Sequence, residues 1–205
     1  ERMGINVWEV VDAAKTKPFG FMPFYPSPGV GGHCIPIDPF FLAWKAQEYD
    51  FSTRFIRVAG EINDRMPEYV VDRITDVLNR HKQCLNGAKV LLVGMSYKQD
   101  TNDLRHAPAV KVASLLKQRE ADAFYHDPYV PCCQVNGETL YSTLLERDTL
   151  NESNIVVITT DHSGIDYELI ADHAPLVYDT RNALKDYRDR PHVFQLGGVG
   201  PYSHG

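Results

Sequence analysis

The stretch KVLLVGMSYKQDTNDLRHAPAVKVASLLKQREADAFYHDP, residues 89–128, decides the fold class. It begins with the apolar run Lys89–Val93, which is typical of a buried strand. Pro108–Arg119 is expected to form a helix, and Asp122–Tyr125 a second strand that ends at His126-Asp127-Pro128. A strand, a crossover helix and another strand in this order make up one unit of a parallel sheet.

The same alternation continues toward the C-terminus. Ile155–Thr160 (IVVITT), Leu176–Tyr178 and Val193–Leu196 predict a third, a fourth and a fifth strand, with a short helix near Tyr167–Ala171. Short apolar strands separated by helices are typical of a doubly wound sheet, so residues 85–205 are expected to form a largely parallel, Rossmann-like α/β domain.

The residues before the sheet are predicted to be mainly helical. Met3–Ala14 and Thr53–Arg80 carry apolar residues at helical spacing. Phe40–Tyr49 continues another helix, which lies between these two in the sequence. Pro67 is expected to kink the helix over Thr53–Arg80 or to split it in two. Residues 1–84 are therefore expected to form a helical segment in front of the sheet domain.

Between the first two helices lies KPFGFMPFYPSPGVGGHCIPIDP, residues 17–39. Its six prolines and four glycines exclude a helix or a central strand and predict a long loop, which its aromatic residues would keep ordered. Cys34 stands near the end of this loop, before Asp38, the expected N-cap, and Pro39, the expected first helical residue.

The position of Cys34 suggests a nucleophile. The positive end of a helix dipole stabilises a thiolate, and a thiolate can attack a carbonyl carbon and hold the product covalently. The residues alone leave two alternatives open. A lone cysteine is often a small buried apolar residue, and His33, Cys34 and Asp38 could be metal ligands, although their spacing fits no common metal site.

Charged residues also follow the first strand of the sheet. Ligands of open parallel sheets bind beyond the carboxyl ends of the strands, and Lys98 and Arg105 would suit a phosphate there. Arg181 follows a later strand and is expected at the same edge. Only Gly94 stands where a GxGxxG fingerprint would be, which argues against dinucleotide binding by this domain. A solvated loop with an internal Asp103–Arg105 pair remains an alternative.

The composition bounds the class of protein. The formal net charge of −6 argues against nucleic-acid binding, and no apolar window reaches the ~18 residues of a membrane span. The first residues do not resemble a secretory signal, and the four cysteines show no CxxC spacing. We therefore expect a cytoplasmic protein with free thiols.

Together these segments resemble the UDP-glucose/GDP-mannose dehydrogenase family, and within it the bacterial UDP-N-acetylglucosamine 6-dehydrogenase branch. The resemblance runs through nearly the whole chain. It is carried by FMPFYPSPGVGGHCIPIDPFFLAWKA (21–46), VAGEIND (58–64), VGMSYKQDTNDLRHAPA (93–109), YHDP (125–128) and YDTRN (178–182).

The resemblance implies a reaction. Family members oxidise C6 of a nucleotide sugar twice, from alcohol through aldehyde to carboxylate, with NAD as cofactor and no metal. Cys34 matches the nucleophile, which forms a thiohemiacetal and then a thioester, and Asp38 matches a carboxylate that assists the thiol or the hydrolytic water. The resemblance also implies a homodimer formed through the central helices.

The resemblance further assigns binding residues. Arg105 matches a residue on the NAD side, and Lys17 lies near the position of a basic residue that a neighbouring subunit provides. The positions that match contacts to the UDP-sugar are Phe24, Tyr25, Ser27, Val30, Gly31, Tyr97, Lys98 and Arg181.

Two departures from the family pattern matter. Ile37 stands where the UDP-glucose branch has a lysine, which favours a UDP-N-acetylhexosamine, UDP-GlcNAc or UDP-ManNAc, as substrate. The family's NAD-binding domain has no counterpart in these residues, so we expect a fragment that is inactive alone. Two other hypotheses remain open: a nucleotide-sugar-binding module without chemistry, and a flavodoxin-like interaction domain, which leaves the cysteine loop unexplained.

Overall fold

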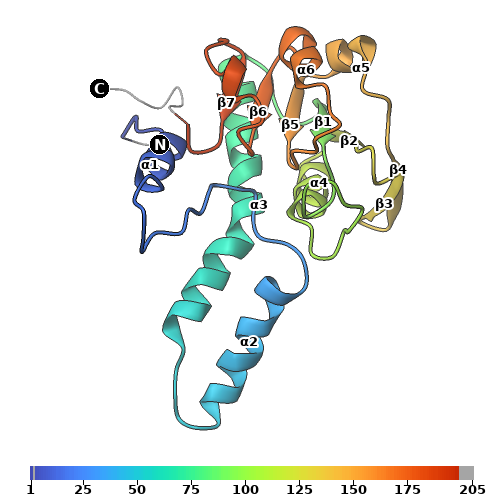
Figure 1. Ribbon diagram of the computed structural model, residues 1–205. Coiled ribbons are helices and arrows are strands. Elements are labelled where there is room, and N and C mark those ends of the chain that lie inside the picture. The colour runs from blue at the N-terminus through green and yellow to red at the C-terminus, as the bar shows by residue number, and fades with distance from the viewer. Residues whose placement is uncertain (2, 199–205) are drawn as a thin grey trace.

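The computed structural model describes residues 1 and 3–198 (Figure 1). Within them, five strands form one sheet in the order β2-β1-β5-β6-β7, and every neighbouring pair is parallel. The strands are β1 (Lys89–Val93), β2 (Asp122–His126), β5 (Ile155–Ile158), β6 (Val177–Asp179) and β7 (Val193–Gln195). The predicted parallel α/β fold is confirmed.

Helices cover both faces of this sheet. Along β1, Val90 and Leu92 belong to one buried cluster while Leu91 and Val93 belong to another, because successive side chains of a strand point to opposite faces. The C-terminal half of α3 (Arg54–Arg80) and α4 (Pro108–Gln118) contribute to the first cluster. The second contains residues from α5 (Arg147–Glu152) and α6 (Tyr167–His173). The domain is therefore doubly wound, as expected.

An antiparallel hairpin, β3 (Cys132–Val135) and β4 (Glu138–Tyr141), was not expected from the sequence. Its turn is Asn136-Gly137, and both residues have positive φ angles, 52° and 81°. Asn-Gly between two strands is a strong hairpin signal because both turn positions require positive φ. The Asn136-Gly137 pair was therefore a usable sequence signal for this hairpin. The vicinal pair Cys132-Cys133 belongs to its first strand.

Helices α2 (Cys34–Gln47) and α3 form a second hairpin, which extends away from the sheet (Figure 1). Gly60 of α3 allows their close approach, because a Cβ added there would lie 2.1 Å from the ring of Phe40. Helix α3 continues through Pro67, so of the two predicted alternatives, a kink or a split, the split is wrong. Val70, Val71 and the apolar residues that follow are buried in the core, and this packing outweighs the ~3 kcal/mol cost of an internal proline.

Helix α1 (Val7–Ala14) begins at Val7 rather than at Met3. The side chain of Asn6 caps it and accepts the backbone N–H of Trp8 at 2.9 Å. The Trp8 ring is buried, and its Nε1–H donates to the carbonyl of Leu196 at 2.7 Å. The N-terminal helix is thereby attached to the segment after β7. A 3₁₀ turn, Lys185–Tyr187, lies between β6 and β7.

Candidate functional site

The catalytic-cysteine candidate lies at the start of a helix. Helix α2 begins at Cys34, with His33 at the N-cap position, and the His33 side chain makes no capping hydrogen bond to the described residues. The predicted role of Asp38 as N-cap is therefore wrong. The first four N–H groups of a helix lack intrahelical partners, so Pro36 is tolerated in the first turn and the helix starts earlier than expected.

This earlier start changes the relation between Cys34 and Asp38. Both side chains are exposed, and they stand at positions i and i+4 of one helix. Residues four apart are neighbours on a helix surface, about 5–6 Å between Cβ atoms. The thiol is thus at the positive end of the helix dipole, with a carboxylate one turn away on the same face.

The glycine loop before Cys34 packs directly on the loop that follows β1. The Gly32 N–H donates to the carbonyl of Arg105 at 2.9 Å. A Cβ on Gly31 would lie 2.6 Å from Cβ of Tyr97 and 2.7 Å from the carbonyl oxygen of His106. Only glycine fits this contact. The structure therefore brings together two sequence-predicted segments, the cysteine loop and the loop of Tyr97 and Arg105.

A second contact holds the same loop from the side of α3. Asn63 Oδ1 accepts the Val30 N–H at 2.7 Å, and its Nδ2 donates to the Val30 carbonyl at 3.4 Å. The Ser27 hydroxyl donates to the carbonyl of Gly29 at 3.1 Å. Asn63 was not selected from the sequence as a site residue, although it lies in the VAGEIND segment. It holds the backbone N–H and carbonyl of Val30, one of the predicted substrate-loop positions.

Arg105 is paired within its own loop. Its Nε lies 3.0 Å from both carboxylate oxygens of Asp103, and its Nη2 lies 2.6 Å from Oδ2. This hydrogen-bonded pair lowers the pKa of the Asp103 carboxyl. Asp103 is also the main cause of a raised pKa of Arg105, to which Tyr97 and Cys34 add smaller contributions. The guanidinium therefore has the Asp103 carboxylate as its main partner.

Tyr25, a predicted substrate residue, is bound to α1. Its ring stacks on Trp8 with centroids 5.3 Å apart. Its hydroxyl donates to Asp12 Oδ1 at 2.8 Å and accepts from Lys15 Nζ at 2.9 Å. These contacts orient the tyrosine, whereas the ring of its neighbour Phe24 is 76% exposed.

Lys17, predicted to lie near the position of a basic residue that a neighbouring subunit provides, lies over the ring of Phe19. Its Nζ is 5.4 Å from the ring centroid, which is a cation–π geometry.

Arg181 follows β6 and shares the carboxyl edge of the sheet with the loop after β1, as expected. Its Nε donates to Asp161 Oδ1 at 2.9 Å, and its backbone N–H donates to Asp179 Oδ1 at 2.8 Å. Asp179 is buried, and this burial raises the pKa of its carboxyl against the hydrogen bonds from Leu184 and Arg181.

Gly94, the single glycine in the loop after β1, allows this loop to contact the loop after β5. Its φ is +86°, and a Cβ there would lie 2.5 Å from the Thr160 carbonyl oxygen. The loops after β1 and β5 therefore touch at the point where the strand order reverses. The described residues of this loop form no dinucleotide cradle of the GxGxxG kind.

The described part of the chain contains no group of three or more His, Cys, Asp or Glu side chains arranged to hold a metal ion. Among the same residues, no helix is both long and apolar enough to cross a membrane.

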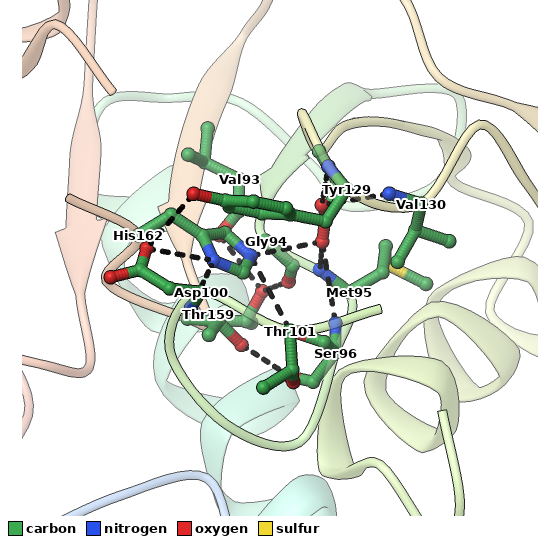
Figure 2. Close-up of polar contacts among 12 residues, drawn as sticks. Val93, Gly94, Met95, Ser96, Asp100, Thr101, Tyr129, Val130, Thr159 and His162 are labelled. Carbon is green, nitrogen blue, oxygen red and sulfur yellow. Dashed lines mark hydrogen bonds and ion pairs between the residues drawn. The ribbon is translucent and has the colours of Figure 1, made fainter. Parts of the chain in front are cut away.

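A buried polar cluster holds the loop after β1 in place (Figure 2). Asp127, after β2, accepts the N–H groups of Met95 and Ser96 on Oδ2, at 2.6 and 3.3 Å. Its Oδ1 accepts the N–H groups of Tyr129 and Val130. Burial opposes the charged form, but hydrogen bonds from His162 and these backbone groups outweigh it, so the pKa of Asp127 is lowered. Neither Asp127 nor His162 was selected from the sequence.

Comparison with known proteins explains the two halves of this arrangement. Residues 1–65 match the profile of the UDP-glucose/GDP-mannose dehydrogenase family, central domain, and residues 91–186 match the UDP binding domain of the same family. The chain belongs to the UDP-glucose/GDP-mannose dehydrogenase family. The contact between Gly31 and Tyr97 therefore joins residues that match two different domains of that family.

Individual members of the family show the same correspondence. A UDP-N-acetyl-D-mannosamine dehydrogenase of Methanococcus maripaludis is 32% identical over 193 residues, which are 90% of this chain and 42% of the relative. A UDP-N-acetyl-D-glucosamine 6-dehydrogenase of Pseudomonas aeruginosa is 37% identical over 129 residues, 63% of this chain and 30% of the relative. The chain thus spans less than half the length of these relatives.

A solved structure agrees with the described fold. The UDP-D-ManNAc dehydrogenase of Pyrococcus horikoshii superimposes with a TM-score of 0.78 at 28% sequence identity. The match covers 95% of this chain and 44% of that chain.

Proposed function

We propose that this chain carries the catalytic cysteine and the nucleotide-binding domain of an NAD-dependent nucleotide-sugar 6-dehydrogenase. The supporting observation is the contact of Gly31 and Gly32 with Tyr97 and Arg105, because it puts Cys34 next to the cationic loop at the sheet edge. The names of the relatives and Ile37 favour a UDP-N-acetylhexosamine as substrate, either UDP-GlcNAc or UDP-ManNAc.

In this proposal, Cys34 captures the C6 aldehyde. The thiolate adds to the carbonyl carbon, a C–S bond forms, and the carbonyl oxygen takes a proton to give a thiohemiacetal. The N-terminus of α2 favours negative charge at the sulfur, and Asp38, one turn away, takes the thiol proton or activates water. NAD accepts hydride in such oxidations. Of the described residues, Arg105 is the one proposed to face NAD, and the loop after β1 lacks the glycine pattern of a dinucleotide cradle.

The nucleotide would bind at the carboxyl edge of the sheet. Tyr97 and Lys98 from the loop after β1, and Arg181 from the loop after β6, are the proposed contacts to the UDP moiety. Lys98 is exposed and Arg181 is half-buried, so both cations are accessible to a diphosphate. Phe24, Tyr25, Ser27, Val30 and Gly31 are proposed to contact the sugar side.

We also propose a homodimer through the α2–α3 hairpin. Large apolar side chains are exposed there: Phe41 (64%), Leu42 (61%), Trp44 (63%), Phe55 (93%) and Ile62 (60%). An apolar groove of about 520 Å³ runs along α2, lined by Pro36, Ile37, Phe40, Phe41 and Trp44. Exposed apolar surface of this kind marks an interaction site, and an isologous contact between two copies would cover it.

A binding module without chemistry is the second candidate, favoured by the lack of a dinucleotide cradle among the described residues. The two candidates differ at Cys34. A catalytic remnant requires a thiol that reacts faster with iodoacetamide than the exposed Cys84 and Cys132, whereas a passive loop requires similar rates at all three.

Calorimetric titration tests the binding part of the proposal. The chain is titrated with UDP, UDP-GlcNAc, UDP-glucose and NAD⁺. We expect the UDP ligands to bind, NAD⁺ not to bind, and Lys98→Ala to weaken UDP binding. A folded chain that does not bind UDP would contradict the proposal.

A further inference from the structure

His162 lies in the centre of the polar cluster in Figure 2 and is completely buried. The Asp100 N–H points at its Nδ1 at 2.9 Å, and its Nε2 lies 3.1 Å from Asp127 Oδ2. A backbone N–H can only donate, so Nδ1 is unprotonated and accepts. The proton is then on Nε2 and is donated to Asp127, with Ser96 Oγ as a second acceptor at 3.4 Å. The contacts define one neutral tautomer.

Through this ring, three loops are joined. Asp100 belongs to the loop after β1, Asp127 follows β2 and His162 follows β5. The Asp100 carboxylate in turn accepts the N–H and the hydroxyl of Ser163, at 2.9 and 2.8 Å, and these bonds lower the pKa of Asp100. In the middle of the loop after β1, Asp100 is therefore held both by its backbone N–H and by its carboxylate.

Lys98 lies between Ser96, whose N–H donates to Asp127, and Asp100, whose N–H donates to His162. The Lys98 carbonyl accepts two hydroxyls, from Ser96 at 2.8 Å and from Thr101 at 3.0 Å. Asp100 has a φ of +56°, a left-handed conformation that costs a non-glycine residue free energy and persists where surrounding contacts hold it. His162 supplies the contact to the N–H of this strained residue.

We propose that His162 is a positioning residue for nucleotide binding: its Nδ1 accepts the Asp100 N–H and so fixes the loop that presents Lys98 to the diphosphate. This inference rests on the proposed function. A loop that is already fixed loses less conformational entropy when the ligand binds, so the histidine increases affinity without touching the ligand.

Two substitutions separate the two ring nitrogens. His162→Asn keeps an acceptor at the place of Nδ1, and His162→Gln keeps a donor at the place of Nε2. We expect His162→Gln to weaken UDP binding at least ~10-fold, because the Asp100 N–H, whose hydrogen bond to His162 is part-buried, loses its acceptor. We expect His162→Asn to stay within ~3-fold of the original chain, since that acceptor remains.

The measurements are calorimetric titration with UDP and hydrogen exchange of the Asp100 amide, with thermal unfolding of each variant. A merely structural histidine would make both variants lose affinity in parallel with stability, and that result would overturn the inference. Equal UDP binding by His162→Gln and the original chain would overturn it as well.

The exchange measurement keeps this inference separate from the proposed function. We expect the Asp100 amide to exchange at least ~10-fold faster in His162→Gln than in His162→Asn, because only the latter keeps the acceptor. If the original chain does not bind UDP, the proposed function fails and so does the role of His162 in binding. The exchange rates then still show whether His162 orders the loop.

Discussion

The carboxyl edge of the sheet and the α2–α3 hairpin differ in how their side chains are accommodated: polar side chains are buried and hydrogen-bonded at the edge, and large apolar side chains are exposed on the hairpin. At the sheet edge, Asp127 and His162 are buried, and the chain itself supplies their hydrogen bonds. On the hairpin, Trp44 and Phe55 are 63% and 93% exposed. The difference indicates that the sheet edge is preorganised by this chain, whereas the hairpin surface requires a partner, which we propose is a second copy.

The largest expected effect is at Asp127. Asp127→Ala removes an acceptor of several buried backbone N–H groups and leaves His162 without its carboxylate. A buried N–H that loses its acceptor costs ~1–3 kcal/mol, so the loss of several such contacts should lower the free energy of unfolding by ~3–5 kcal/mol in urea unfolding. Asp72→Ala, which breaks the exposed pair with Arg119, is the control and should cost less than ~1 kcal/mol. Equal costs would contradict the contrast between buried and exposed polar groups.

The next effect concerns the contact between the sheet edge and the glycine loop that leads into α2. Gly31→Ala should lower the free energy of unfolding by ~1–3 kcal/mol, because its Cβ would lie 2.6 Å from Cβ of Tyr97. Gly164→Ala serves as a control, since a Cβ there meets no described atom within 4 Å. If Gly31→Ala is as stable as the control, the loop does not pack on the sheet domain as described.

Two buried aspartates should respond to pH with opposite signs. The folded-state pKa of Asp127 is lowered, so its stabilisation is present above the unfolded value of ~3.9 and is lost as pH falls through the folded pKa. The pKa of Asp179 is raised, so its contribution is present below the unfolded value and is lost as pH rises through the folded pKa. Urea unfolding from pH 3 to 7 should show a flatter acid limb for Asp127→Asn. Asp179→Asn should instead remove a decrease above ~pH 4, and identical profiles would contradict both assignments.

The smallest effect on folding is expected on the hairpin. Phe55→Ser should change the free energy of unfolding of the monomer by less than ~0.5 kcal/mol, because this side chain is exposed. It should shift the dimer toward monomer in sedimentation velocity if two copies meet there. Tyr141→Ser, at a 70% exposed side chain of β4, is the control and should leave the oligomeric state unchanged. A Phe55→Ser variant that dimerises like the original chain would exclude this surface.

The sequence predicted the elements whose signals are local. The apolar runs at β1 and β5 and the periodicity of α3 gave the parallel sheet and the long helix. The start of α2 was misplaced because Pro39 was assumed to open the helix, whereas Pro36 already lies in its first turn. The β3–β4 hairpin could have been predicted from Asn136-Gly137.

The cluster around His162 could not be predicted in this way. Asp100 and Asp127 are 62 and 35 residues away from the histidine in the sequence. They meet it only because the order β2-β1-β5 brings three strand ends together. A single sequence contains no local pattern for such a contact, and the same holds for the pairing of Asn63 with Val30.

The central claim is that Cys34 and the nucleotide-binding edge share one surface. Mass spectrometry can follow iodoacetamide alkylation of Cys34, Cys84 and Cys132, which are all exposed, with and without saturating UDP-GlcNAc. We predict that Cys34 reacts fastest and that UDP-GlcNAc slows its alkylation at least ~10-fold without affecting the other two cysteines. A bound UDP-sugar that leaves the rate at Cys34 unchanged would contradict the account.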